Sequence, residues 1–332
     1  MAYTTIDNPE LYFQTKLYTG TGSEIAATLD GSENMQPDLV AIKARTDTES
    51  HKVYDSVRGV TKHIEWDTTD AEATEAQGLK SFDSDGFTIG TYSSINASSS
   101  HTYVAWCWKE SATSGFDIVA FTGNATARTI SHSLSAVPHV IIVKPRESGS
   151  EGWSMYHKGI ASDAETDNIR LDEANAAFDN AGYWNDTAPT SSVFTVGSDS
   201  ATNTNTEGVI AYLFAPKQGF SKFGEYDGNG NADGTFVYTG FKPALVIYKK
   251  YDAHGQGWVM NDNKRDPFNV ADAVFYANTN EAESDYDSVD FLANGFKHRS
   301  TGGSHNASGS EYVYLAFAEA PFVNSNGVPC NA

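Results

Sequence analysis

The chain has 332 residues, and its 22 Lys and Arg against 43 Asp and Glu give a formal net charge of −21. This negative charge repels the phosphate backbone of nucleic acids and anionic lipid surfaces, so neither is an expected partner. Hydrophobic residues form 39% and aromatic residues 12% of the sequence, which is enough apolar material for folded cores and argues against disorder.

The N-terminal sequence MAYTTIDNPELYFQTK has neither a basic n-region nor an apolar h-region, so we do not interpret it as a signal peptide. The apolar runs elsewhere fall well short of the ~20 residues that a transmembrane helix needs. We therefore expect a soluble protein made in a cytoplasm, with no membrane insertion. Residues 1–13 precede the first repeated segment and contain Tyr12 and Phe13. They form either an arm that docks on a neighbouring subunit or an ordinary first strand.

A first signature occurs three times along the chain: a Gly-rich turn, an apolar segment, a Pro, and an alternating run that ends in a basic residue. The three copies span residues 18–45, 121–146 and 226–250. Their prolines, at intervals of 101 and 105 residues, are Pro37, Pro138 and Pro243. The runs DLVAIKAR, HVIIVKPR and ALVIYKK predict buried strands that end at the surface. A Pro is tolerated just before such a strand.

A second signature closes each copy with a near-continuous apolar run, TYVAWCW, GVIAYLF or YVYLAFA, as expected for a strand covered on both faces. Three aromatic residues align in these runs at intervals of 106 and 103 residues: Trp108, Phe214 and Phe317. Two independent signatures at matching intervals predict three diverged repeats. The predicted organisation is an N-terminal arm (1–13), three repeats (14–110, 115–216 and 221–322) and a C-terminal tail (323–332).

The predicted fold is all-β, with three tandem antiparallel units of β-sandwich or jelly-roll type. Gly-containing turns such as SDG and ANG connect the strands. Residues 68–76 and 162–178 contain helix formers but no long apolar stripe, so we expect short surface helices or loops there. We hypothesise that the three units pack around a pseudo-threefold axis, and the alternative is three separate beads. Cys107 and Cys330 are not expected to form a disulfide.

No catalytic motif of the GxSxG, HExxH, CxxC or P-loop type occurs, and the nine His show no metal-ligand spacing. We therefore predict a non-enzymatic protein without a cofactor. Residues 227–234 (DGNGNADG) form a weak calcium candidate, because four oxygen-bearing side chains alternate there: Asp227, Asn229, Asn231 and Asp233. Ala232 and Tyr238 stand where a calcium loop needs Gly and a bidentate Glu, which favours a plain turn.

Trp153, Tyr156 and His157 lie together in GWSMYHKG, and Trp258 occupies the matching point of the next repeat. These four residues are weak candidates for a carbohydrate platform. Their recurrence, with KVYDSVRG (52–59) as the counterpart in the first repeat, favours a core strand instead. Basic residues end these strands and are candidates for fixed structural ion pairs: Arg58, His157 and Arg265. The glycosylation patterns at Asn96 and Asn306 recur at one repeat position, which favours turn chemistry.

Long segments of the chain resemble repeat proteins encoded by marine tailed bacteriophages, including phages of ocean bacteria and cyanobacteria. The segments are YDSVRGVTKHI, FDSDGFTIG, INAS, YVAWCWK, SKFGEYDGNGNADGTFVYTGFKPALV, KRDPFNV, FLANGFKHR and YLAFAEAPFV. The resemblance covers nearly the whole chain, and it implies a virion structural or tail-associated protein with no catalytic residues to carry over.

The expected function is thus a non-enzymatic structural component of a bacteriophage virion, either a capsid decoration or a tail, fibre or knob protein. Its expected partners are other virion proteins, and a homotrimer is expected by analogy with phage appendages. The alternatives are an adhesin of the tail that binds host-surface glycans and, less favoured, a polysaccharide depolymerase.

Overall fold

The computed structural model describes residues 3–330, apart from the side chain of Asp287, and confirms the predicted all-β class. The first unit has a large sheet in the spatial order β1 (Phe13–Thr19), β9 (Thr102–Trp108), β3 (Leu39–Ala44), β4 (Lys52–Asp55), β5 (Lys62–Glu65) and β6 (Ala73–Thr74). Its small sheet has β2 (Ile25–Ala27), β8 (Gly86–Ile89) and β7 (Leu79–Asp83). Two short helices, η1 (Pro9–Leu11) and α1 (Ser93–Asn96), accompany these strands.

The second unit repeats this strand order. Its large sheet has β10 (Phe116–Thr122), β17 (Gly208–Phe214), β12 (Val140–Pro145), β13 (Ser154–His157), β14 (Asp167–Arg170) and β15 (Phe178–Asp179). Its small sheet pairs β11 (Arg128–Ser131) with β16 (Val193–Val196). The short helices of this unit are η2 (Ala164–Thr166), α2 (Ala181–Trp184) and α3 (Ser200–Asn203).

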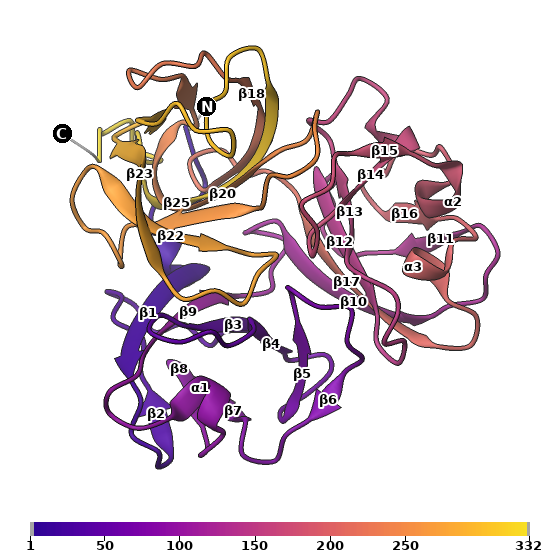
Figure 1. Cartoon of the computed structure of the whole chain (residues 1–332), viewed down its shortest axis with the longest axis horizontal. Helices are drawn as coiled ribbons and strands as arrows, with labels where there is room; N and C mark the ends of the chain where they lie inside the picture. Colours follow the sequence, from indigo (N-terminus) through magenta and orange to yellow (C-terminus); the bar gives the residue numbers. More distant parts are fainter. Residues whose placement is uncertain (1–2, 331–332) are drawn as a thin grey trace.

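The third unit joins its strands into one curved sheet. The order is β18 (Ser221–Asp227), β25 (Glu311–Pro321), β20 (Phe241–Lys250), β21 (Val259–Asp262), β22 (Ala271–Tyr276), β23 (Ser284–Leu292), β24 (Gly295–His298) and β19 (Phe236–Tyr238). In every unit the first strand pairs antiparallel with the last, and the last pairs with the third. Figure 1 shows the three units as three lobes around a common centre.

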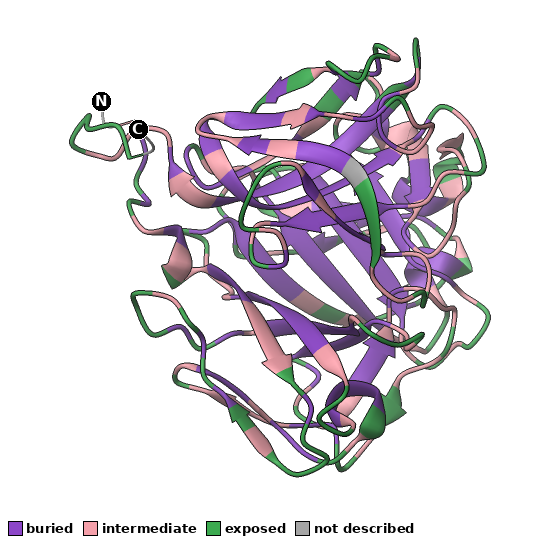
Figure 2. Ribbon diagram, turned by 60° about the vertical axis from the view of Figure 1, so that its left-hand side comes forward, coloured by how far each residue is buried: buried purple, intermediate pink, exposed green. Residues whose placement is uncertain are grey.

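The central strands of each large sheet are buried on both faces, as β3 and β12 show. Successive side chains of a strand point to opposite faces, so Val40 and Ile42 pack with Phe87 of the small sheet, while Leu39 and Ala41 belong to the cluster shared by the three units. The near-continuous apolar runs of the sequence are therefore explained. Figure 2 shows the buried residues along the strands of the interior and the exposed residues mainly on the connecting loops.

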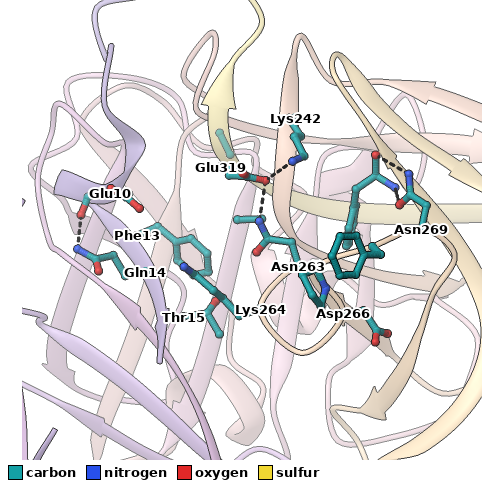
Figure 3. Close-up of a pocket in the computed structure, with 15 residues that line it drawn as sticks. Glu10, Phe13, Gln14, Thr15, Lys242, Asn263, Lys264, Asp266, Asn269 and Glu319 are labelled. Carbon is teal, nitrogen blue, oxygen red and sulfur yellow. Dashed lines mark hydrogen bonds and ion pairs between the residues drawn. The ribbon is translucent and has the colours of Figure 1, made fainter. Parts of the chain in front are cut away.

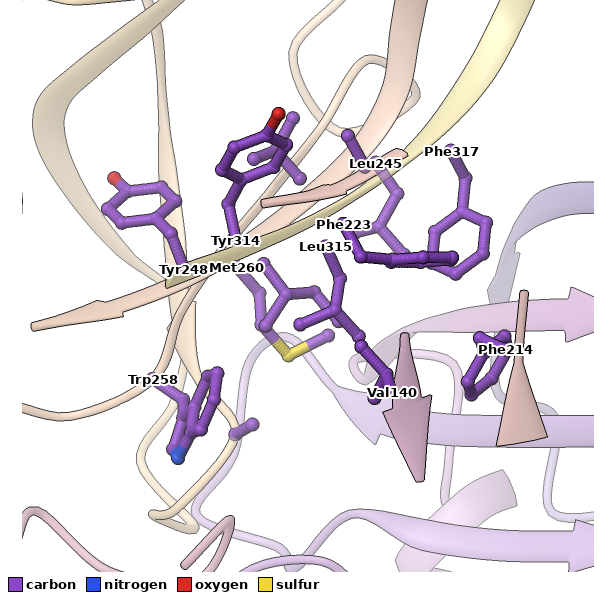
Figure 4. Packing of buried hydrophobic residues seen from close by; sticks show 14 of the residues in the cluster. Val140, Phe214, Phe223, Leu245, Tyr248, Trp258, Met260, Tyr314, Leu315 and Phe317 are labelled. Atoms are coloured by element: carbon purple, nitrogen blue, oxygen red, sulfur yellow. The ribbon is translucent and has the colours of Figure 1, made fainter. Parts of the chain in front are cut away.

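The aligned aromatic residues of the three closing strands meet at the centre of the molecule. The ring centroids of Trp108 and Phe317 are 5.6 Å apart, and those of Phe214 and Phe317 are 5.7 Å apart. Figure 4 shows Phe214 and Phe317 packed near Val140, Leu245 and Leu315. The three units therefore share one core and do not form separate beads.

Three backbone hydrogen bonds connect each unit to the next, and the amide of Gly255 in the third unit also donates to the carbonyl of Ala174 in the second at 2.8 Å. The amide of Glu72 donates to the carbonyl of Arg146 at 2.6 Å, joining the first unit to the second. Ala177 donates to Tyr251 at 2.8 Å, joining the second to the third, and Glu283 donates to Arg45 at 2.9 Å, joining the third to the first. The contacts thus close into a ring.

The N-terminal segment packs on the third unit of its own chain. The Tyr3 hydroxyl donates to the carbonyl of Gly240 at 2.8 Å, and the Thr4 hydroxyl donates to the carbonyl of Gln218 at 2.6 Å. Ile6 is buried, and Phe13 begins β1. Residues 3–13 thus contact the third unit of their own chain, and the first strand begins at Phe13.

Two local expectations need correction. Residues 162–178 contain the short helix η2, as expected, but the strand β14 follows it, and residues 68–76 contain the two-residue strand β6 in place of a helix. The run at Pro243 starts earlier than expected, because β20 includes this Pro at a β-bulge. Cys107 is buried and Cys330 is exposed, and both thiols are free.

Candidate functional site

The candidate carbohydrate platform lies inside the protein. Trp153, Trp258 and His157 are 0% exposed and Tyr156 is 2% exposed, so no sugar reaches them and the core interpretation applies to all four. Burial lowers the pKa of His157 to about 4, which keeps its ring neutral at pH 7. Its Nε2 atom lies 3.1 Å from the carbonyl oxygen of Tyr314 in the third unit.

The two tryptophans connect neighbouring units. The indole of Trp153 donates to the carbonyl of Glu65 in the first unit at 2.6 Å, and that of Trp258 donates to the carbonyl of Arg170 in the second unit at 2.8 Å. His51, which precedes the matching strand of the first unit, lies with Nε2 3.1 Å from the carbonyl of Tyr276 in the third. In all three units, the residue just before this strand therefore contacts a backbone carbonyl of a neighbouring unit.

The calcium candidate is a hydrogen-bonded turn. The Asn229 side-chain oxygen accepts from the Asn231 amide at 2.9 Å and from Asn306 Nδ2 at 2.7 Å, and the Asn231 oxygen accepts from the Asp233 amide at 3.0 Å. The Asp233 carboxylate forms an ion pair with Lys297. Within residues 3–330, no cluster of three His, Cys, Asp or Glu could hold a metal ion. The hydrogen bonds of Asn229 and Asn231 therefore support the interpretation of this loop as a turn.

Asn306 has an equivalent in each of the other two units, Asn96 and Asn203, and all three side chains accept the same kind of backbone hydrogen bond. Asn96 accepts from the Thr21 amide at 2.8 Å, Asn203 from Asn124 at 2.9 Å, and Asn306 from Asn229 at 2.9 Å. All three side chains are 0% exposed. The glycosylation pattern at Asn96 and Asn306 is thus explained by a buried turn.

Buried ionic clusters occupy two of the three unit boundaries. Asp262 and Arg265 have fully buried side chains, and Arg265 also reaches Glu283, which binds Arg45 of the first unit. The second cluster has the same form and contains Asp55, Arg58, Glu72 and Arg146. Burial alone would raise the pKa of Glu72, but the bond from Arg146 and the charge of Arg58 outweigh it and lower that pKa.

One lysine per unit is buried where we expected the strand to reach the surface. Lys43, Lys144 and Lys249 are 0% exposed, and each ammonium donates to backbone carbonyls. Lys144 reaches the carbonyl of Thr69 in the first unit at 3.0 Å, and Lys249 reaches that of Glu173 in the second at 3.2 Å. Burial lowers the pKa of all three lysines to about 8.

These lysines predict that stability rises between pH 8 and 9. Their pKa falls from 10.5 in the unfolded chain to about 8 in the fold, so the unfolded state binds more protons in this window. Each should add roughly 1 kcal/mol over this one pH unit. Urea unfolding at pH 8 and 9 measures the slope. Lys249→Met should reduce the slope by about a third, whereas an unchanged slope would contradict a buried, neutralisable Lys249.

An accessible cleft lies between the first and third units. It encloses about 460 Å³, within the usual range for ligand pockets. Its lining residues come from five separate segments: Glu10, Phe13, Gln14 and Thr15; Lys242 and Ala244; Asn263, Lys264, Asp266, Pro267, Phe268 and Asn269; Phe291; and Ala318 and Glu319. Figure 3 shows Glu10 and Gln14 on one side, Lys242, Asn263 and Glu319 on the other, and Phe13 between them.

The polar groups of the cleft are fixed by mutual bonds. Glu319 binds the Lys242 ammonium at 2.9 Å and accepts from Asn263 Nδ2 at 2.7 Å. On the opposite side, Glu10 accepts from the Ser32 amide at 2.8 Å. Lys264 forms no ion pair with any residue in 3–330. The arrangement offers acceptors and donors in set positions around an open space.

No local sequence pattern indicates this cleft as a whole, because its lining brings together residues more than 300 positions apart. One local signal was present. The β21–β22 connection contains Phe268, which is 83% exposed, whereas the matching segments SVRGVT (56–61) and KGIASDAET (158–166) have no aromatic residue. A large apolar side chain on a loop tip of only one unit is a reason to look for a binding function there.

A family model described as a domain of unknown function (DUF7483) matches residues 8–321. This range runs from the N-terminal segment to the end of the third unit. No curated protein matches the sequence. Within residues 3–330, no helix has both the length and the apolar character needed to cross a membrane.

Proposed function

The chain belongs to the DUF7483 family, and we propose that it is a non-enzymatic structural component of a bacteriophage virion, as a capsid decoration or a tail, fibre or knob protein. The observation that supports this role is the closed ring of three interlocked units. Directional contacts at each boundary, two buried ionic clusters and a shared aromatic centre favour a rigid block over a molecule with moving parts.

The buried polar side chains also support this proposal. At the unit boundaries Asp55, Asp262 and His157 have their polar groups engaged with neighbouring units and lie out of reach of a substrate. These buried polar groups hold the units together, whereas groups that act on a substrate need to be accessible to it. The resemblance to repeat proteins of marine phages agrees with such a role, with other virion proteins as the partners and the host cytoplasm as the place of synthesis.

The proposal is tested by quantitative mass spectrometry of density-purified phage particles that encode this chain. The expected result is a stoichiometric copy number per particle, with the protein retained after a high-salt wash. Detection only in the lysate, with none in the particles, would exclude the structural role. Cryo-electron microscopy of the same particles then distinguishes density on the capsid lattice from density on the tail.

A further inference from the structure

The boundary between the second and third units lacks the ionic cluster that each of the other two boundaries has. Glu72 pairs with Arg146 across the first–second boundary. Glu283 pairs with Arg45 across the third–first boundary. Within residues 3–330, apart from the Asp287 side chain, no ion pair joins the second unit to the third. The reason lies in the residues that occupy equivalent positions of the repeat.

The strand registers identify the first of these positions. Asp55, His157 and Asp262 are equivalent, because each lies opposite the residue that also pairs with the aligned aromatic residue of the closing strand. A histidine thus replaces the aspartate in the second unit. Three positions further on, Ile160 stands where the other two units have an arginine.

The other half of the cluster is replaced in the same way. The amide of Ala177 donates to the carbonyl of Tyr251 at 2.8 Å. The equivalent amides at the other boundaries belong to Glu72 and Glu283, and the acceptors there belong to arginines. All four positions of the cluster therefore have residues that form no ion pair at this boundary: His157, Ile160, Ala177 and Tyr251.

His157 fits this boundary only as a neutral ring. Its Nδ1 atom accepts from the Gly159 amide at 3.0 Å, so the ring proton is on Nε2, which donates to the carbonyl of Tyr314 in the third unit at 3.1 Å. A second proton on Nδ1 would place two donors against each other. The ring is 0% exposed, so its charge would also have no water around it. Protonation therefore requires this contact to open.

We propose that the boundary between the second and third units is an acid-sensitive seam, at which the ring of units opens when His157 is protonated while the other two boundaries stay closed. The open form takes up a proton that the closed form excludes, so acid shifts the equilibrium toward the open form. The third unit stays attached to the first through the Arg45–Glu283 pair. The seam is closed at neutral pH, and the proposed structural role does not depend on it.

The groups around His157 do not compensate its charge. Burial is the main cause that lowers the pKa of His157, and the half-buried His139 beside it lowers this pKa further. Lys158, the next residue, is a second cation. On the facing strands, burial raises the pKa of the Tyr314 hydroxyl, which stays neutral, and Glu225 is exposed, so solvent screens its charge.

The third–first boundary contains a comparable histidine but has additional support. His51 is also 0% exposed, and its Nε2 atom lies 3.1 Å from the carbonyl oxygen of Tyr276 in the third unit. Acid therefore weakens this contact as well. The buried pair of Asp262 and Arg265 remains there to hold the units together, whereas the second–third boundary has no ion pair to take over.

The test is amide hydrogen exchange of the full chain at pH 7 and pH 5, expressed as protection factors, which correct for the intrinsic effect of pH. The pKa of His157 is about 4 in the closed form and 6.5 when exposed, so the open form binds more protons between these values and the closed form loses stability as the pH falls. Protection of the Ala177 amide should fall about 20-fold. Protection of the Glu72 and Glu283 amides should fall clearly less.

His157→Gln replaces the ring by a side chain that does not titrate and whose oxygen can still accept a hydrogen bond. The fall in Ala177 protection between pH 7 and pH 5 should shrink to less than about 3-fold. His51→Gln is the matched control, because it removes a buried histidine from a different boundary and should leave the fall at Ala177 intact. The two pH values are compared within each variant, so a general loss of stability does not affect the comparison.

Three results would overturn the proposal. Equal losses of protection at Glu72, Ala177 and Glu283 would mean that acid acts on the whole fold. Unchanged protection of Ala177 at pH 5 would mean that the seam does not open. A full loss at Ala177 that persists in His157→Gln would mean that this histidine is not the trigger. The first two results need no variant, and none of the three bears on the presence of the chain in the virion.

Discussion

Replacement of Asp262 by alanine is expected to lower the free energy of unfolding by about 3–5 kcal/mol. The Asp262 carboxylate accepts from Arg265 Nε at 2.6 Å and from the Trp106 indole of the first unit at 3.1 Å. Its removal leaves the guanidinium of Arg265, whose side chain is 0% exposed, without its main counter-charge. Equilibrium urea unfolding at pH 7 measures the loss.

The matched comparison is Asp233→Ala, which removes an ion pair of the same kind from the surface. Asp233 is 73% exposed and pairs with Lys297, so solvent screens this pair and its loss should lower the free energy of unfolding far less than the loss of Asp262 does. The double variant Asp262→Leu/Arg265→Met should recover most of the stability, because it removes both charges together. Equal effects of Asp262→Ala and Asp233→Ala would contradict a buried ionic cluster at this boundary.

Replacement of Phe317 by alanine is expected to lower the free energy of unfolding by about 3–5 kcal/mol, and it should destabilise all three units together. The Phe317 ring contacts one aromatic residue of the third unit and several from the other two, with centroid distances of 5.4 Å to Phe13, 5.6 Å to Trp108 and 5.7 Å to Phe214. The side chain is 2% exposed, so its removal opens a cavity at the common centre. Unfolding followed by fluorescence and by circular dichroism should show a single transition with the same midpoint for both probes, and this midpoint should be lower than in the unmodified chain.

Phe317→Leu tests whether the volume of the centre matters, and it should cost clearly less than the alanine variant. Phe236→Ala, at an exposed position, should change stability by less than about 0.5 kcal/mol. If the third unit alone were destabilised by Phe317→Ala while the other two kept their transition, the shared core would not exist in solution.

The strand frame could be predicted from the sequence because it rests on local patterns. The apolar run TYVAWCW and its two counterparts predict strands that are covered on both faces. The alignment of Trp108, Phe214 and Phe317 indicates which residues are equivalent in the three repeats. Their spacing did not reveal that the three rings touch, since that depends on how the sheets pack. The fold class was therefore accessible, and the assembly of the units was only a hypothesis.

The boundary contacts could not be predicted, because each joins a side chain to a backbone group in another unit. Nothing in the local sequence of Trp153 or Lys144 indicates a bond to the carbonyl of Glu65 or Thr69. Lys144 was expected at a strand end in solvent, since an unpaired buried lysine is rare. The carbonyl oxygens that compensate its burial are visible only in three dimensions.

The cleft has the same origin. Thr15 and Asn263 are ordinary polar residues in sequence, and they come to line one cleft only when β1 and the β21–β22 loop meet. Phe268 differs from the matching segments of the other units, which have no aromatic residue. A comparison of the three repeats at loop positions, in place of a search for catalytic motifs, is thus the sequence approach that leads toward this site.

The most direct test of the account is amide hydrogen exchange at the three bonds that close the ring. The amides of Glu72, Ala177 and Glu283 donate across the unit boundaries at 2.6, 2.8 and 2.9 Å. If the units form one rigid block, these amides exchange as slowly as those of β9, β17 and β25 in the core. If they exchange much faster than the core strands at neutral pH, the units separate in solution and the interlocked ring that supports the structural role is wrong.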